Sequence, residues 1–209
     1  MSAEWGAWSA LFFLGAYHGI NPGMGWLFAV ALGMQERHRG AVWRAMLPLA
    51  AGHALAIAAA VAMAMMVGAV VPLRAIQWIV GGMLLVLGIS RCFRHGHPRW
   101  VGMRVGPKDL TWWSFLMASA HGAGLMVLPL VLGAAAPAHC ASTSAGGGIW
   151  PAASATLLHS AGYLIVSAAI ATVVFEKLGL GVLRTAWINL DLIWAVALVA
   201  TSLATILLA

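Results

Sequence analysis

Long apolar runs separated by short polar connectors follow one another along the whole chain. A helix needs about 20 predominantly apolar residues to cross the hydrocarbon core of a bilayer. Six runs meet that requirement, so the pattern predicts six membrane-spanning helices. The approximate bounds of these runs are 8–33, 45–70, 73–91, 111–134, 150–175 and 185–208.

The composition agrees with a membrane location. Hydrophobic residues make up 63% of the 209 residues and charged residues only 8%, with a mean hydropathy of +0.95. Soluble domains carry about 25% charged residues, so we expect an all-α polytopic membrane protein whose main partner is the lipid bilayer. The net charge of +6 does not indicate nucleic-acid binding, because the basic residues lie in short connectors and not on a folded basic face.

Basic residues are distributed unevenly between alternate connectors. Ten of the eleven Lys and Arg residues fall into three connectors, 34–44, 91–110 and 176–184. Since basic residues favour the cytoplasmic side, the pattern predicts three cytoplasmic connectors, both termini outside, and a multi-pass protein of the bacterial inner membrane. Cys92 and Cys140 then lie on opposite sides of the membrane, and no disulfide between them is expected.

The first run contains residues that an ordinary membrane helix avoids. His18 is titratable, and Asn21-Pro22 interrupts the helical hydrogen bonding. A break within hydrocarbon is tolerated only where it packs against protein or lines a cavity. We therefore expect the first helix to be broken at Asn21-Pro22 and to form part of a buried site, as the discontinuous helices of transporters do. Glycines at positions 15, 19 and 23 indicate the close approach of a neighbouring helix.

The two halves of the chain share a pattern of histidines. His18 and His53 are 35 residues apart, and His121 and His159 are 38 residues apart. The stretch Ala-Tyr-His-Gly-Ile-Asn-Pro-Gly-Met around the first histidine corresponds to Ser-Ala-His-Gly-Ala-Gly-Leu-Met around the third. Three runs in each half, starting on opposite sides, predict two inverted three-helix repeats. A single transmembrane domain, 1–209, then comprises repeat 1 at about 8–91, the cytoplasmic connector 91–110 and repeat 2 at about 111–208.

All four histidines are expected near the middle of the membrane. Each lies 8 to 10 residues inside its run, which at 1.5 Å per residue is about 12–15 Å into a core about 30 Å thick. Intramembrane ionisable residues are usually functional, and the alternative is a hydrogen-bonded packing role. Neutral imidazole is the commonest metal ligand and titrates near neutral pH. The candidate ligands for Cu, Zn, Ni or Co are His18, His53, His121 and His159.

Four other residues are candidate substrate ligands: Asn21, Met24, Met126 and Asp191. The thioethers of the two methionines would favour Cu(I), while their alternative role is to fill gaps in the core. The Asn21 amide either binds a ligand or satisfies a backbone group freed by Pro22. Asp191 is the only carboxylate within a run, and its alternative partner is Arg184. No phosphate-binding loop or hydrolase motif is present, so the sequence does not indicate an enzyme.

These features resemble the lysine-exporter (LysE) superfamily, and most of all its nickel/cobalt exporter branch. The first motif of that branch typically reads His-Ala-Leu-Glu-Pro-Gly-His, and the corresponding stretch here is His18-Gly19-Ile20-Asn21-Pro22-Gly23-Met24. The resemblance implies six helices in two inverted triplets and an exporting site that includes His18. Asn21 and Met24 stand where that branch has an acid and a second histidine.

The combined pattern predicts a proton-coupled secondary transporter that moves a transition-metal cation through the four-histidine site by rocking one triplet against the other. Four neutral ligands around a divalent ion would leave an uncompensated charge in lipid, so Cu(I), or a metal with a co-bound anion, is expected ahead of Ni(II) or Co(II). The alternative function is an exporter of an amino acid or another small solute, with the histidines carrying protons. A further alternative is a membrane redox protein with histidines as axial ligands of haem b. The sequence does not determine the oligomeric state and is compatible with a homo-oligomer.

Overall fold

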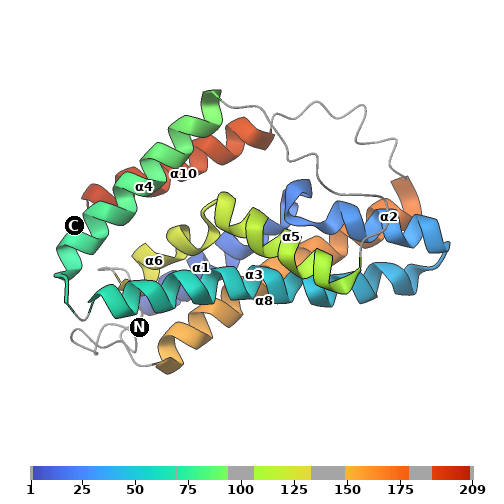
Figure 1. Cartoon of the computed structure of the whole chain (residues 1–209), viewed down its shortest axis with the longest axis horizontal. Helices are drawn as coiled ribbons and strands as arrows, with labels where there is room; N and C mark the ends of the chain where they lie inside the picture. The colour runs from blue at the N-terminus through green and yellow to red at the C-terminus, as the bar shows by residue number, and fades with distance from the viewer. Residues whose placement is uncertain (1, 69, 94–105, 133–148, 179–189, 208–209) are drawn as a thin grey trace.

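The computed structural model describes residues 2–68, 70–93, 106–132, 149–178 and 190–207. Within these residues every regular element is helical, which confirms the predicted all-α class (Figure 1). The elements in chain order are α1 (Ser2–Ile20), the 3-10 turn η1 (Pro22–Met24), α2 (Trp26–Glu36), α3 (Arg39–Gly68), α4 (Leu73–Phe93), α5 (Pro107–Ala120), α6 (Ala123–Leu132), α8 (Ile149–Val173), the π-helical turn η2 (Val174–Leu178) and α10 (Leu190–Leu207).

Helix length and composition indicate a membrane protein. Three helical stretches are long and apolar enough to cross a bilayer: Arg39–Gly68, Leu73–Ser90 and Trp150–Lys177. A fourth span results if Pro107–Ala120 and Ala123–Val131, which are bent by 61° relative to each other, form one crossing. In α10, the apolar stretch Ala195–Leu207 is shorter than a span. Three or four spans are therefore supported by the described helices, and six spans stay a prediction.

The first predicted run is divided by the expected break. α1 ends at Ile20, Asn21 has an extended backbone with φ −69° and ψ 120°, and α2 begins only at Trp26. Pro22 explains the break, because it lacks an N–H and disfavours a helical conformation in the residue before it. The break leaves α1 with 19 residues and α2 with 11, and α2 alone is too short to cross a bilayer.

The predicted connector 34–44 is mostly helical, which corrects its boundaries. α2 continues to Glu36, Arg37 turns the chain with a positive φ of 53°, and α3 begins at Arg39. α3 has 30 residues and is about 45 Å long at 1.5 Å per residue, which exceeds the hydrocarbon core. Its basic first turns remain helical because Arg is a good helix former and intrahelical hydrogen bonds form equally well outside the hydrocarbon.

The tightest helix pairs join the two halves of the chain. α1 packs along α8, α3 packs along α5, and α4 packs along α10. Suppose that α1 corresponds to α5, α3 to α8 and α4 to α10. The pair α1–α8 then corresponds to the pair α5–α3, and the pair α4–α10 consists of two corresponding helices. Figure 1 also shows corresponding helices running in opposite directions, for example α1 from left to right and α5 from right to left. This pairing of helices is the one that two equivalent halves would produce.

Glycines let two of these pairs approach backbone to backbone. A Cβ at Gly15 would overlap the carbonyl group of His159, across α1 and α8. A Cβ at Gly52 would overlap the carbonyl group of Thr111, across α3 and α5. Small residues at such contacts are typical of membrane helix packing. The close approach predicted from Gly15 is thus confirmed, and α8 is the neighbouring helix.

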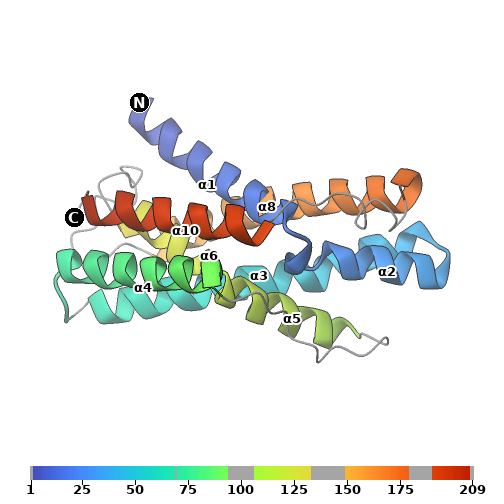
Figure 2. The same cartoon turned by 90° about the horizontal axis from the view of Figure 1, so that it is seen from above.

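α4 and α10 form a pair set apart from the other helices. The two helices lie side by side in both Figure 1 and Figure 2. Ser202 of α10 donates a hydrogen bond to the carbonyl oxygen of Gly81 in α4 at 2.8 Å. The pair touches the rest of the described chain chiefly through α6. The four helices that carry the candidate histidines therefore pack without α4 or α10 between them.

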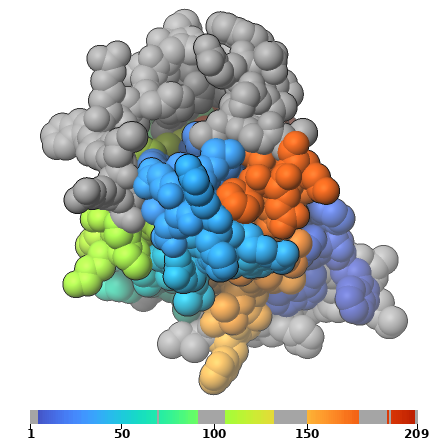
Figure 3. Space-filling view, turned by 90° about the vertical axis from the view of Figure 1, so that its right-hand side faces the viewer, coloured from blue at the N-terminus to red at the C-terminus, as the bar shows by residue number. Residues whose placement is uncertain are grey.

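Charged residues gather at one end of the bundle. The C-terminus of α2, the N-termini of α3 and α5 and the turn η2 lie at the right-hand end of Figure 1, which faces the viewer in Figure 3. Two ion pairs connect these ends, Arg44 with Glu36 and Arg39 with Glu176, the latter at 3.6 Å. α4, whose second residue is Arg74, begins at the opposite end. The charge asymmetry predicted from the sequence is therefore present between the helix ends.

Candidate functional site

Three of the predicted histidines form a compact cluster inside the bundle. His18 comes from the last turn of α1, His53 from the middle of α3 and His159 from α8. The ring centroids of His18 and His53 are 5.6 Å apart, those of His18 and His159 are 5.0 Å apart, and those of His53 and His159 are 5.4 Å apart. All three side chains are fully buried.

The fourth histidine, His121, lies beside this cluster. It follows the last residue of α5, is almost completely buried, and is close enough to His18 to interact with it electrostatically. All four predicted histidines are therefore buried, three of them in one cluster and the fourth within electrostatic range of His18. The helices α1, α3 and α8 each contribute one imidazole, and the fourth belongs to the residue that directly follows α5.

His18 and His121 are held in the same way in the two halves of the chain. The Nδ1 atom of His18 is 2.8 Å from the carbonyl oxygen of Leu14, and the Nδ1 atom of His121 is 2.8 Å from that of Met117. A carbonyl oxygen can only accept, so each Nδ1 donates the hydrogen. A neutral imidazole then has its lone pair on Nε2. A backbone carbonyl that fixes the tautomer in this way is typical of histidines that bind metals.

His53 and His159 have parallel rings and few polar contacts. Their ring planes differ by 3°, and His53 also stacks on the ring of Tyr163, with centroids 4.0 Å apart and planes 9° apart. Neither ring nitrogen of His53 has a hydrogen-bond partner among the described residues. The ring nitrogens of His159 also lack a hydrogen bond of good geometry among these residues, although the carbonyl group of Leu11 lies near the ring. Such unpartnered buried polar atoms are rare in proteins and mark candidate ligand sites.

The imidazoles of the cluster are not arranged as the ligands of a metal ion. No group of three or more His, Cys, Asp or Glu side chains among the described residues converges as a metal ion requires. Nitrogen ligands must point at one ion from about 2.0–2.1 Å, whereas the stacked rings of His53 and His159 direct their nitrogens along parallel planes. Binding of a metal ion by this cluster would therefore require at least one imidazole to rotate.

Asn21 caps the turn that follows α1. Its side-chain oxygen accepts a hydrogen bond from the N–H of Gly23 at 2.9 Å, and the residue is 8% exposed. Of the two roles predicted for Asn21, the structure shows the one that satisfies a backbone group freed by the proline. The side-chain oxygen is therefore already engaged within η1.

Side chains from several helices satisfy the carbonyl groups of the break. The donor and acceptor pairs are Ser167 to Gly19 (3.2 Å), Trp26 to Ile20 (3.1 Å), Trp113 to Gly23 (3.2 Å) and Tyr163 to Met24 (2.8 Å). In hydrocarbon each unpaired carbonyl would cost several kcal/mol. These four bonds explain how an unwound segment is stable in the interior of the bundle.

Sequence reasoning did not identify Tyr163, Ser167 and Trp113 as residues of the site. Tyr163 and Ser167 are fully buried, and they follow His159 at intervals of four residues. Residues at this spacing share one face of a helix. A polar stripe along one face of an otherwise apolar helix was the signal that could have identified them.

The second half of the chain has a break of its own, which corrects the predicted continuous run 111–134. α5 ends at Ala120, His121 has φ −90° and ψ 0°, and α6 begins at Ala123. No proline lies at this point. Gly122 turns the chain instead with a positive φ of 72°, a conformation that glycine adopts at little cost. His18 and His121 thus each lie at the end of an interrupted helix.

The remaining predicted ligands lie in different surroundings. Met24 and Met126 are buried in the hydrophobic core that also contains Tyr163. Asp191 belongs to α10, but its side chain lies outside the described residues, as do Arg184 and Cys140. The structure therefore places the two thioethers in the core and leaves the carboxylate of Asp191 a prediction.

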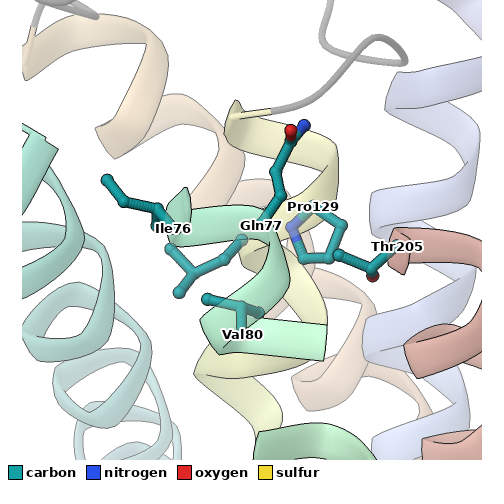
Figure 4. Close-up of a pocket in the computed structure, with 6 residues that line it drawn as sticks. Ile76, Gln77, Val80, Pro129 and Thr205 are labelled. Carbon is teal, nitrogen blue, oxygen red and sulfur yellow. The ribbon is translucent and has the colours of Figure 1, made fainter. Parts of the chain in front are cut away.

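A small hollow is distinct from the histidine cluster. It lies between α4, α6 and α10 (Figure 4), and none of the histidines borders it. The lining residues are Ile76, Gln77, Val80, Leu128, Pro129 and Thr205. The space accommodates no more than about one water molecule. It is too small to serve as a binding site for an organic substrate.

Comparisons with protein-family models, curated proteins and solved structures find no match for this chain. The features of this chain that bear on its function are the histidine cluster, the two helix breaks and the sequence pattern.

Proposed function

We propose that the protein is a proton-coupled secondary transporter that binds a transition-metal cation at His18, His53, His121 and His159. One observation carries the proposal: three imidazoles with ring centroids no more than 5.6 Å apart lie in the interior of an apolar helical bundle, and His121 interacts electrostatically with one of them, His18. Ionisable groups are expensive inside a membrane and are generally retained for function. Imidazole can both bind a transition metal and exchange protons near neutral pH.

The helix breaks support a cationic substrate. His18 lies in the last turn of α1, and His121 directly follows α5. The C-terminus of a helix carries a partial negative charge that favours cations, and transporters place such half-helix ends beside bound ions. The buried residues in the described part of the chain include no carboxylate. The partial negative charges of the two helix ends would compensate a monovalent cation more completely than a divalent one. Cu(I) is therefore proposed ahead of the divalent metals.

We further propose six spans in two inverted three-helix repeats, with both termini outside a bacterial inner membrane. The equivalent pairing of α1 with α8 and of α3 with α5 supports the repeats. The basic residues at one end of the bundle support a cytoplasmic side there. The likeness of the stretch 18–24 to the first motif of the LysE superfamily, in particular its nickel/cobalt exporters, supports the same architecture.

An exporter of an amino acid or another small solute is the second candidate function. The observation in its favour is that the imidazoles do not converge on one point, so they are also suited to carry protons while other groups hold the solute. Haem b has less support, because the ring of Tyr163 stacks on His53 at 4.0 Å and the three clustered histidine rings lie within 5.6 Å of one another. A porphyrin needs a wide, flat gap between its axial ligands.

Metal binding to the purified protein at two pH values tests the proposal. Cu(I), Zn(II), Ni(II) and Co(II) are compared by equilibrium dialysis or calorimetry. Metals bind neutral imidazole, so affinity should fall when the pH is lowered far enough to protonate the imidazoles, and binding at such a pH should release protons. A variant with all four histidines replaced by Ala should lose binding, whereas His38→Ala, which removes an exposed histidine, should keep it.

Equal affinity of the native protein and the four-histidine variant for every metal would exclude metal transport. In that case the colour of the preparation separates the remaining functions. A red preparation would indicate haem, and a colourless one would favour the small-solute exporter.

A further inference from the structure

We propose that Tyr163 is a positioning residue that links the histidine cluster to the break between α1 and α2. The inference rests on the proposed function, because it concerns how a change at the cluster reaches the interrupted helix. Tyr163 lies on α8, one helical turn after His159, and its side chain is fully buried.

The two ends of the Tyr163 side chain make two different contacts. Its ring stacks on the imidazole of His53, with centroids 4.0 Å apart and planes 9° apart. Its hydroxyl donates a hydrogen bond to the carbonyl oxygen of Met24 at 2.8 Å. Met24 is the last residue of η1, within the break. One rigid side chain therefore connects a candidate ligand on α3 with the unwound segment.

The hydroxyl of Tyr163 replaces a helical hydrogen bond that the break removes. In a continuous helix the N–H of Phe28 would donate to the carbonyl of Met24, but it donates to the carbonyl of Gly25 instead, at 3.0 Å. An unpaired carbonyl is unfavourable in hydrocarbon. Loss of the Tyr163 bond should therefore destabilise the backbone at Met24.

Rotation of His53 should disturb this bond. The imidazoles do not converge in their present orientation, so binding at the cluster requires a ring such as His53 to turn. The turning ring either leaves the face of Tyr163 or carries the phenol with it. If the phenol moves with the imidazole, its hydroxyl moves away from the carbonyl oxygen of Met24, because the rigid phenol moves as one piece. The orientation of His53 and the geometry of residues 21–25 are therefore coupled through Tyr163.

Trp113 provides a matched control for this coupling. It lies on α5 and also donates to a carbonyl at the break, that of Gly23 at 3.2 Å. Its ring pairs with that of Phe28. Trp113→Phe removes the donor and keeps an aromatic ring, so it should loosen the break without affecting the contact between Tyr163 and His53. A second control is Tyr17→Phe, at the only other tyrosine of the chain.

A double-mutant cycle read by hydrogen exchange tests the link without any metal. Amide exchange in a peptide that covers residues 19–28 is measured in the purified protein with its native sequence, His53→Ala, Tyr163→Phe and the double variant. We expect His53→Ala to accelerate exchange at residues 23–25 by about tenfold when Tyr163 is present and by no more than about twofold in the Tyr163→Phe background. With Trp113→Phe or Tyr17→Phe, the effect of His53→Ala should be as large as in the native sequence.

Equal effects of His53→Ala with and without the Tyr163→Phe substitution would overturn the proposal, and so would the absence of any effect in the native background. Tyr163→Met, which retains apolar bulk, replaces Tyr163→Phe in the cycle if the latter does not fold. Because no metal is present, failure of this test is distinct from failure of metal binding. A cluster that binds no metal would leave the measured coupling intact.

Discussion

The four histidines differ in what holds them. His18 and His121 are fixed by Nδ1–H bonds to the carbonyls of Leu14 and Met117, so the orientation of each Nε2 is set by its own helix. His53 has no such bond among the described residues and is held by stacking on Tyr163. Stacking restrains a ring less strictly than a hydrogen bond. We infer that the first pair provides preoriented nitrogens and that His53 adapts to them.

Asn21 offers a test of capping against ligand binding. Asn21→Ala removes the acceptor for the N–H of Gly23 and should lower the free energy of unfolding by about 0.5–2 kcal/mol, the usual cost of a lost cap. Asn21→Ser keeps a side-chain oxygen that accepts well at this position, so it should retain most of the stability. Thermal unfolding in detergent and metal binding are measured together. Loss of metal affinity in both variants, with stability unchanged, would show a ligand role instead.

Gly25 is the residue at which the break depends most directly on glycine. Its φ is +118°, and a Cβ there would also overlap the side chain of Leu49. Gly25→Ala should therefore destabilise the protein by at least about 1–2 kcal/mol, the cost of a left-handed backbone for an ordinary residue. Gly82→Ala is the control, because a Cβ at this position of α4 would meet nothing within 4 Å and Ala favours a helix by about 0.5–1 kcal/mol. Equal melting temperatures for the two variants would contradict this account.

At the level of elements, local sequence was informative where one residue decides the backbone. Pro22 fixes the first break, and the apolar runs locate α3, α4 and most of α8. The second break was not predicted, because Gly122 is compatible with a continuous helix and only the tertiary packing selects its positive φ. The predicted run begins at about residue 45, whereas α3 begins at Arg39. Charged residues interrupt an apolar run, but they do not end a helix.

The pairing of helices also bears on how the bundle moves. The sequence predicts rocking of one triplet against the other, yet α1 packs along α8 and α3 along α5, across the two repeats. Movement of intact triplets would separate both pairs. Their contacts are close, since Gly15 and Gly52 bring backbone against backbone. We therefore expect α1 with α8, and α3 with α5, to move as the units.

A larger residue at Gly15 should separate the α1–α8 unit. Gly15→Ala places a methyl group against the carbonyl of His159, which forces the helices apart and shifts His18 relative to His159. We expect a lower melting temperature and at least a tenfold loss of metal affinity. Gly6→Ala, on the same helix, meets nothing within 4 Å and should leave both quantities unchanged. Native-like binding in the Gly15 variant would show that the α1–α8 contact does not set the site.

For the whole molecule, the sequence pattern selected the three histidines that form the cluster, together with His121, but not the residues that surround them. Similar positions in the two halves were enough to select His18, His53, His121 and His159, because residues at similar distances from the start of an apolar run are expected at similar depth. Tyr163, Trp113 and Ser167 escaped notice, since their importance comes from bonds to the broken backbone, which depend on the packing of α5 and α8 around it. The prediction of six spans requires the broken pair α1 and α2 and the short α10 to cross the membrane, and it also depends on whether the bent pair α5 and α6 does so.

The two native cysteines test this last question. Cys92 and Cys140 flank the α5–α6 segment in sequence, so they lie on opposite sides if the bent pair is a span and on the same side if it is a re-entrant loop. The positive-inside pattern predicts Cys92 in the cytoplasm and Cys140 outside. In Cys92→Ser protein, a membrane-impermeant maleimide should label Cys140 in intact spheroplasts. In Cys140→Ser protein, Cys92 should react only after the membrane is opened, and the double variant should not be labelled. Labelling of both single-cysteine proteins from the same side would show a re-entrant loop and would rule out the six-span inverted repeat.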